Sequence, residues 1–191
     1  MSFDVLIVGI GGQGTILTSN ILGEACVIEG IPVRGAETHG MAQRGGSVEC
    51  QVRIGQKFGP LIAPGTADLI ISFDLMEAAR ACHYLKEGGS IFTSRVFVVP
   101  TSVFMQDYPA PDEQMLLSFL EDRNVTIVDA KSLSEEAGSI LTQNVVLLGA
   151  ASSLLPLSEN SLREAISRTV PKKTIELNLK AFDLGKGSVI T

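Results

Sequence analysis

The feature that most constrains the fold is an apolar run near the N-terminus that ends in a cluster of glycines. Residues 3–10, FDVLIVGI, are continuously apolar and rich in β-branched side chains, which is typical of a strand buried on both faces. Residues 11–30 then place apolar side chains at helical spacing up to a stop at Gly30; they are Ile16, Leu17, Ile21, Leu22, Ala25 and Ile28. Residues 31–35 indicate a second strand. We therefore predict a parallel strand–helix–strand unit with a right-handed crossover.

Strands and helices alternate along the rest of the chain. Further strands are predicted at 68–73, within 90–100 and at 125–130. Helices are predicted at 74–85, opened by a capping box at Asp74–Glu77, and at 132–155. Two more are predicted, one after a capping box at Ser161–Glu164 and one at 174–184 that Gly185 ends, and a surface loop is predicted at 100–113. This order predicts a three-layer, Rossmann-like α/β fold with a mostly parallel sheet, and one domain over residues 1–191.

One strand has a different pattern, because its apolar and polar residues alternate. In residues 47–54 the apolar side chains point to one face and the polar ones to the other: Val48, Cys50, Val52 and Ile54 against Ser47, Glu49, Gln51 and Arg53. Alternation of this kind predicts a partly exposed strand, either at an edge of the sheet or on a partly covered face.

Charge and hydropathy exclude two classes of partner. The formal net charge of −6 argues against nucleic acid, because phosphate binding needs a basic face. No apolar run approaches the roughly 20 residues that cross a bilayer, so no membrane association is expected. The N-terminus lacks the basic region and cleavage site of a signal peptide, which predicts a cytoplasmic protein.

The three cysteines predict neither a disulfide framework nor a metal site. Cys26, Cys50 and Cys82 are odd in number, lie far apart and form no CxxC motif. We expect Cys26 and Cys50 to be buried spacers, since their neighbours are apolar.

The first glycine cluster fits a phosphate-binding loop. Gly9, Gly11, Gly12, Gln13 and Gly14 satisfy G-x-G-x-x-G between a strand and a helix, where N–H groups at the helix N-terminus favour an anion. Alternatively, the glycines only let the helix and strand pack closely. A dinucleotide site would also need a carboxylate at the end of the second strand; Glu37 lies late for this role, and Glu29 precedes the strand.

A second cluster combines glycines with polar side chains. Residues 35–46 carry Glu37, His39, Gln43 and Arg44 ahead of Gly45 and Gly46. In a parallel sheet, both glycine loops leave from the carboxyl ends of neighbouring strands, where ligands bind in open α/β sheets. The alternative interpretation is a turn with solvated side chains before the alternating strand.

Together the two clusters resemble a known family. VGIGGQG at 8–14 and AETHGMAQRGGSV at 36–48 resemble the gamma subunits of 2-oxoacid:ferredoxin oxidoreductases, and the similarity continues through residues 64–81, 144–150 and 178–187. The string HGMAQRGG at 39–46 is similar to the small subunit of the indolepyruvate branch.

The resemblance implies a divided enzyme. Thiamine diphosphate and iron–sulfur clusters are then expected on a large partner subunit, which passes electrons to ferredoxin, with coenzyme A as co-substrate. No cofactor is expected to bind tightly to this chain alone, and it should not catalyse unaided.

The resemblance also suggests roles for the two loops. Gly9 and Gly11–Gly14 are expected to hold an anionic part of coenzyme A. Glu37, His39, Gln43 and Arg44, with Gly45 and Gly46, are expected to face the partner's cofactor or the substrate carboxylate. The rival predictions are a stand-alone oxidoreductase that binds NAD or FAD, and a purely structural assembly subunit.

Overall fold

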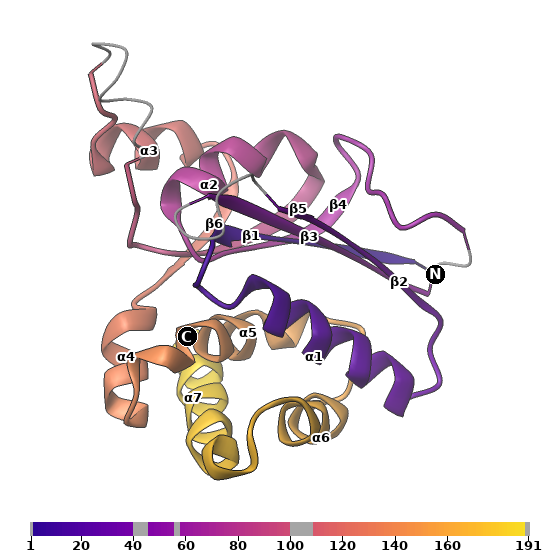
Figure 1. Cartoon of the computed structure of the whole chain (residues 1–191). Coiled ribbons are helices and arrows are strands. Elements are labelled where there is room, and N and C mark those ends of the chain that lie inside the picture. The colour runs from indigo at the N-terminus through magenta and orange to yellow at the C-terminus, as the bar shows by residue number, and fades with distance from the viewer. Residues whose placement is uncertain (1, 40–45, 56–57, 100–108, 190–191) are drawn as a thin grey trace.

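A six-stranded sheet lies between two layers of helices (Figure 1) in the computed structural model, which describes residues 2–39, 46–55, 58–99 and 109–189. The strand order is β2-β3-β1-β4-β5-β6. The strands are β1 Phe3–Ile10, β2 Val33–His39, β3 Ser47–Ile54, β4 Ala67–Ser72, β5 Leu85–Ser94 and β6 Asn124–Val128.

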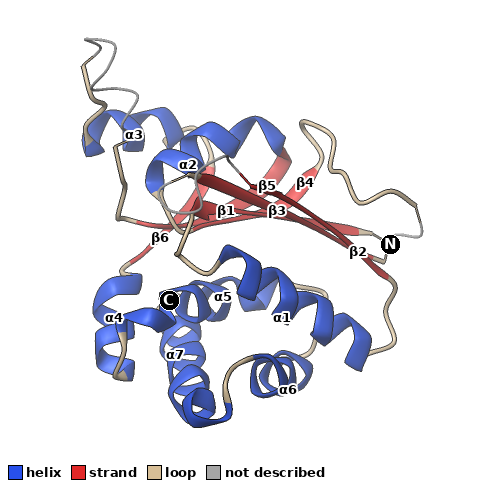
Figure 2. Ribbon diagram, viewed as in Figure 1, coloured by secondary structure: helices blue, strands red, loops and turns tan. Residues whose placement is uncertain are grey.

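The two helical layers differ in size (Figure 2). One face of the sheet is covered by α1 Thr15–Ile28, α4 Ala130–Ala137, α5 Gln143–Ala151, α6 Glu159–Thr169 and α7 Ile175–Gly187. The other face is covered by α2 Leu75–Ala81 and α3 Glu113–Leu120. Short 3-10 turns occur at Cys82–Tyr84, Ile140–Thr142, Ser152–Leu154 and Lys172–Thr174. The predicted three-layer α/β fold is confirmed.

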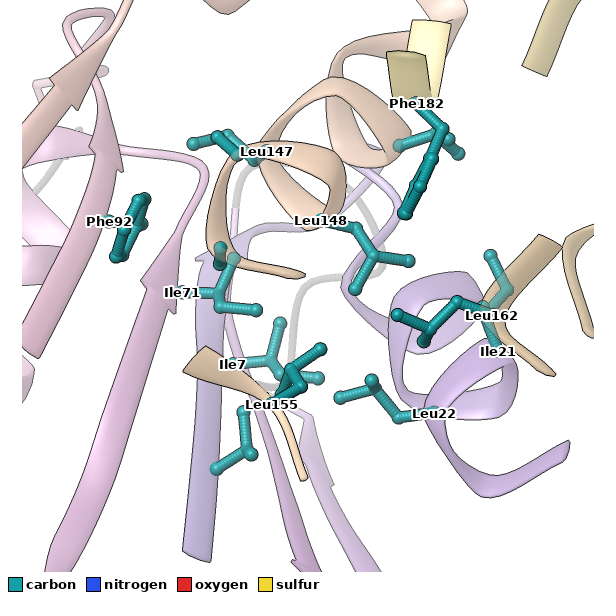
Figure 3. Close-up of a cluster of buried hydrophobic side chains, with 14 of the residues drawn as sticks. Ile7, Ile21, Leu22, Ile71, Phe92, Leu147, Leu148, Leu155, Leu162 and Phe182 are labelled. Atoms are coloured by element: carbon teal, nitrogen blue, oxygen red, sulfur yellow. The ribbon is translucent and has the colours of Figure 1, made fainter. Parts of the chain in front are cut away.

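The buried strand β1 feeds both cores. Val5 and Ile7 pack into the core between the sheet and helices α1 and α5. Leu6 and Val8 pack into the core on the opposite face, between the sheet and α2. Alternate side chains of a strand point to opposite faces, so a strand covered on both sides must be apolar throughout. Figure 3 shows the larger core, where Ile7 and Ile71 of the sheet meet the apolar side chains of the helices.

The prediction that the first two strands are neighbours is wrong. β1 and β2 run in the same direction, but β3 lies between them and is antiparallel to both. After β2 the chain returns through a short connection, which favours an antiparallel hairpin, and this hairpin takes the place beside β1. The remaining pairs, β1–β4, β4–β5 and β5–β6, are parallel.

β3 is therefore an interior strand and not an edge. Its four apolar side chains are buried as predicted, and its polar face is partly covered by the segment that follows. Gln51 accepts a hydrogen bond from the N–H of Ile62 at 2.5 Å, and Arg53 donates to the carbonyls of Gly59 and Leu61. Of the two predicted positions, a partly covered face is the correct one.

Several predicted helix boundaries need correction. The helix predicted at 132–155 is broken at Gly138, whose φ of 116° ends α4. The helix predicted up to residue 85 ends at Ala81, and Leu85 already belongs to β5. α6 begins at Glu159, and its N-cap is Ser158, three residues before the predicted one, since the side chain of Ser158 accepts from the N–H of Ser161. α3 was not predicted, and residues 100–108 of the predicted loop lie outside the described residues.

Two glycines let α5 and α7 approach closely. A Cβ on Gly149 would lie 2.2 Å from the carbonyl oxygen of Phe182, and a Cβ on Gly185 would lie 1.9 Å from that of Val146. Gly185 was predicted to stop the last helix, but α7 continues through it to Gly187. The reason for glycine at position 185 is therefore the backbone contact.

We expect Gly185→Ala to destabilise the fold by about 1–3 kcal/mol or more, because neither backbone can move away without disturbing the buried helix α5. The measurement is urea unfolding. The matched control is Gly23→Ala in α1, where a Cβ meets no atom within 4 Å; it should stabilise by about 0.5–1 kcal/mol. Equal effects of the two variants would contradict the packing argument.

The three cysteines are buried and unpaired. Burial raises the pKa of Cys50 to about 12, and burial together with Glu29 raises the pKa of Cys26 to about 11. These thiols should therefore stay protonated at pH 8, where the thiolate is the reactive form. The predicted role of Cys26 and Cys50 as buried spacers is confirmed by their complete burial.

We expect Cys26 and Cys50 to resist alkylation in the folded chain at pH 8 and to react fully in urea. Mass spectrometry of iodoacetamide-treated protein would locate the modified residues. Rapid labelling of Cys50 under native conditions would contradict its place in the core.

Candidate functional site

The first glycine loop connects β1 to α1 at the carboxyl end of the sheet. Gly12 has a φ of 106° and Gly14 a φ of 89°, values that side chains rarely allow. The side chain of Gln13 closes the turn, since its Oε1 accepts from the N–H of Ile10 at 2.6 Å. The motif thus encodes a tight turn with a fixed shape.

The glycines of this loop have two different functions in the structure. A Cβ on Gly9 would lie 2.8 Å from Oε1 of Gln13, and one on Gly14 would lie 2.9 Å from the side chain of Asn144. A Cβ on Gly12, in contrast, would meet no atom within 4 Å. Gly9 and Gly14 therefore serve close packing, while the loop is open at Gly12.

The N-terminus of α1 is suited to an anion. Gly14 occupies the N-cap position and supplies no side-chain cap, and the first turn contains no acidic residue. The first N–H groups of a helix have no partner inside it and carry the positive end of the helix dipole.

This helix end borders a pocket of about 420 Å³. The pocket is lined by Gly12–Gly14, by Phe73 and Val96 beyond the ends of β4 and β5, by Lys131 of α4, and by residues of the turn before α5 and of α5 itself. After β1 the chain crosses to one face of the sheet, and after β4 it crosses to the other. The pocket thus lies at the switch point where open α/β sheets bind ligands.

The second glycine loop meets the first through the backbone. The N–H of Gly11 donates to the carbonyl of Gly46 at 2.8 Å, and Ser47 pairs with Ile10 in the β3–β1 register. The sequence predicted that the two loops meet, but for another reason. They meet because β3 is antiparallel to β1, so the start of β3 lies beside the end of β1.

Glu37 does not join the residues of this pocket. It lies within β2 opposite Cys50, on the α1 side of the sheet, and borders a different groove formed by α1 and β2. A dinucleotide site needs its carboxylate on the strand next to β1, and β3 occupies that position. Glu29 accepts from the N–H of Ser158 and the hydroxyl of Ser161, which lowers its pKa, so it fastens α1 to α6.

The other residues of the polar loop can be placed only in part. His39 ends β2 and pairs with Val48 in the sheet register. Gln43, Arg44 and Gly45 lie outside the described residues. Their predicted roles are therefore untested by this structure.

The sequence did not predict that a buried polar cluster lies at the same end of the sheet. Glu77 of α2 is only 3% exposed, accepts from the hydroxyl of Ser47 at 2.5 Å and pairs with Arg80 at 2.9 Å. Asp74 is fully buried; burial raises its pKa, although it accepts from the N–H groups of Met76, Glu77 and Val98. The pattern Asp74–Glu77 predicted a capping box, but only Asp74 caps the helix.

Lys131 was also missed. It lies two residues after Asp129, the N-cap residue of α4, and its side chain is exposed at the pocket. The sequence gives no signal for this position, because Lys131 lines the same pocket as the first glycine loop only through the packing of α4 beside the sheet.

We expect Glu77→Ala to destabilise the chain by about 1–3 kcal/mol, because Ser47 loses its buried acceptor. Glu77→Gln keeps an acceptor oxygen and should cost less. Urea unfolding of both variants, combined with Ser47→Ala in a double-mutant cycle, isolates the contact. Strict additivity of Glu77→Ala and Ser47→Ala would show that the hydrogen bond contributes nothing.

Comparison with known proteins identifies the family. A family model described as pyruvate ferredoxin/flavodoxin oxidoreductase matches residues 4–187. The chain belongs to this family. It is 43% identical over 190 residues to indolepyruvate oxidoreductase subunit IorB of Thermococcus kodakarensis, covering 96% of this chain and 94% of that protein. The IorB subunit of Methanothermobacter thermautotrophicus is 38% identical, with 98% of each chain covered. The family member described here is thus an oxidoreductase subunit, and the family predicted by resemblance is confirmed.

Solved structures share the fold of this oxidoreductase subunit. The gamma subunit of a keto/oxoacid ferredoxin oxidoreductase from Geobacter sulfurreducens superposes with a TM-score of 0.73 at 23% identity and covers 98% of each chain. A 2-oxoglutarate:ferredoxin oxidoreductase from Magnetococcus marinus, with 2-oxoglutarate, coenzyme A and succinyl-CoA bound, superposes with a TM-score of 0.75 at 26% identity. All of this chain matches 32% of that longer one. In the described part of the present chain, no helix is long and apolar enough to cross a membrane.

Proposed function

We propose that this chain is the small subunit of an indolepyruvate or arylpyruvate:ferredoxin oxidoreductase and completes an active site carried by a large subunit. The observation that carries the proposal is the hydrogen bond from Gly11 to Gly46, which joins both glycine loops beside the pocket at the switch point. Near full-length similarity to IorB subunits supports the choice of substrate branch.

Thiamine diphosphate and the iron–sulfur clusters belong on the large subunit in this proposal. Cluster ligands are thiolates that lie close together. Here the three thiols are buried, and the described segments hold no group of three or more histidine, cysteine or acidic side chains in a metal-binding arrangement. The residues of this chain therefore do not fit a cluster, whose electrons would pass to ferredoxin through the partner.

Coenzyme A fits the first glycine loop. Gly12 leaves room for a ligand beside the backbone, the N-terminus of α1 offers N–H groups, and Lys131 adds a positive charge to the pocket. These groups would hold an anionic part of coenzyme A. Gly9 and Gly14 act indirectly, because their contacts with Gln13 and Asn144 keep the loop in shape.

The second loop is assigned to the side that faces the large subunit. His39, Gln43 and Arg44, with Gly45 and Gly46, would contact the partner's cofactor or the carboxylate of the 2-oxoacid, with Arg44 as the fixed positive charge. Glu37 takes no part in the pocket of the first loop, so the contact with the partner proposed for it would occur at the groove between α1 and β2.

Reconstitution with the large subunit tests the proposal. We expect dye reduction that requires both chains, a 2-oxoacid and coenzyme A, with indolepyruvate preferred over phenylpyruvate and pyruvate. Activity of the large subunit alone would contradict the proposal. Binding of NAD or FAD by this chain alone, with no association, would instead favour the stand-alone oxidoreductase.

Kinetics of variants assign the two loops. Lys131→Ala should raise the KM for coenzyme A about tenfold, which corresponds to a lost charged hydrogen bond, and leave the KM for the 2-oxoacid unchanged. Arg44→Ala should have the opposite pattern or lower kcat. Lys172→Ala, an exposed lysine in a 3-10 turn away from the pocket, is the control.

If both variants assemble with the large subunit and match the unmodified chain in every constant, neither side chain contacts a substrate. A complex that nevertheless requires this chain would then support the structural assembly subunit.

A further inference from the structure

The outer edge of β6 is the least protected edge of the sheet. In the part of the chain that the structure describes, β6 pairs with β5 alone and without a register shift. Its sequence, NVTIV, contains no charge and no proline. The opposite edge strand β2, VRGAETH, carries Arg34 and Glu37. Charges, prolines and bulges are what keep edge strands from pairing with other chains, and β6 has none of them.

A groove runs beside this edge, between β6 and α3. A pocket of about 420 Å³ is lined by apolar side chains of both elements, Val125 and Ile127 of the strand and Leu117 and Leu120 of the helix, and by the polar side chains of Gln114, Ser118, Glu121 and Arg123. A second pocket of about 460 Å³ continues it, and both share Leu117 and Ile127. Ile127 is 43% exposed, although it lies in a strand. The groove therefore offers space for an aliphatic side chain next to an open strand edge.

We propose that β6 pairs antiparallel with β6 of a second copy of this chain, about a two-fold axis at Thr126. In this register Val125 lies opposite Ile127 of the second copy, and symmetry repeats the pair. Directly opposite side chains lie on the same face of a sheet. Each Ile127 thus enters the groove of the other copy, and two six-stranded sheets join into one.

The charges that flank β6 select this register. Arg123 comes directly before the strand and Asp129 directly after it. With the axis at Thr126 these opposite charges face each other, once on each side of the axis. Arg123 donates to the carbonyl of Phe119 through one nitrogen, and Oδ1 of Asp129 accepts from the N–H of Ser132, so each keeps further polar atoms for the contact.

The flanking charges also explain why a second copy is the proposed occupant. Opposite charges that face each other favour a strand pair. With the axis at Val125 or at Ile127, Arg123 and Asp129 no longer face each other. The edge of β6 is therefore complementary to itself in the register with the axis at Thr126.

A cysteine at the axis tests the register in the full chain. Opposite Cα atoms of an antiparallel pair lie about 4.5–5.5 Å apart, within the range that a disulfide spans. Thr126→Cys should therefore form a covalent dimer on mild oxidation. Asn124→Cys is the matched control, since four residues of offset separate the two copies by about 14 Å. The native cysteines are buried and should not interfere.

Sedimentation measures the association itself. Ile127→Lys should weaken dimerisation about tenfold or more, because an edge lysine opposes strand pairing. Thr38→Lys, the same type of change on the edge strand β2, should have no effect. Arg123→Glu should also weaken the dimer, whereas Arg34→Glu on β2 should not.

Three results would overturn the proposal. The first is a monomer at every concentration with no Thr126→Cys dimer. The second is crosslinking of Asn124→Cys in preference to Thr126→Cys. The third is a monomeric chain whose assembly with the large subunit is abolished by Ile127→Lys, because the edge would then serve that partner. None of these depends on whether the reconstituted complex is active.

Discussion

The candidate site depends on one arrangement, the insertion of β3 between β2 and β1. Antiparallel pairing puts the start of β3 beside the end of β1, and this brings the carbonyl of Gly46 to the N–H of Gly11. A parallel neighbour would have entered at the opposite end of the sheet. The same insertion moves β2 one strand away, so Glu37 cannot serve the first glycine loop as the acidic residue of a dinucleotide site.

Buried polar groups hold this arrangement on the other face of the sheet. Removing a carboxylate from water is costly unless hydrogen bonds or an opposite charge compensate for it. Glu77 meets this condition with Ser47 and Arg80, and so connects α2 to the first residue of β3. The start of β3 is thereby held on two sides, by the backbone of the first loop and by a side chain of α2.

The sequence predicted those features that depend on local pattern. The apolar run of β1, the helical spacing of α1 and the alternation of β3 each identify an element, because burial requires that pattern. What it could not predict depends on contacts between distant segments. The place of β3 in the sheet, the position of Lys131 at the pocket and the packing of Gly185 on Val146 are set by tertiary structure. Gly185 was predicted to end the helix, because a single sequence does not distinguish a glycine required by close packing from a glycine that ends a helix.

The motif G-x-G-x-x-G is less specific than its frequent link with dinucleotides suggests. In this fold Gly9 and Gly14 are required by the neighbouring side chains of Gln13 and Asn144, so a motif match reflects packing at two positions whatever the ligand. In this loop, Gly12 combines a left-handed backbone with open space, whereas Gly14 has a left-handed backbone and a close neighbour. Since the acidic strand position next to β1 is taken by β3, the loop keeps the N–H groups that suit an anion and lacks the feature that would select a ribose. In the function proposed above, Lys131 and the second loop would select the anion, so the motif alone leaves the ligand open.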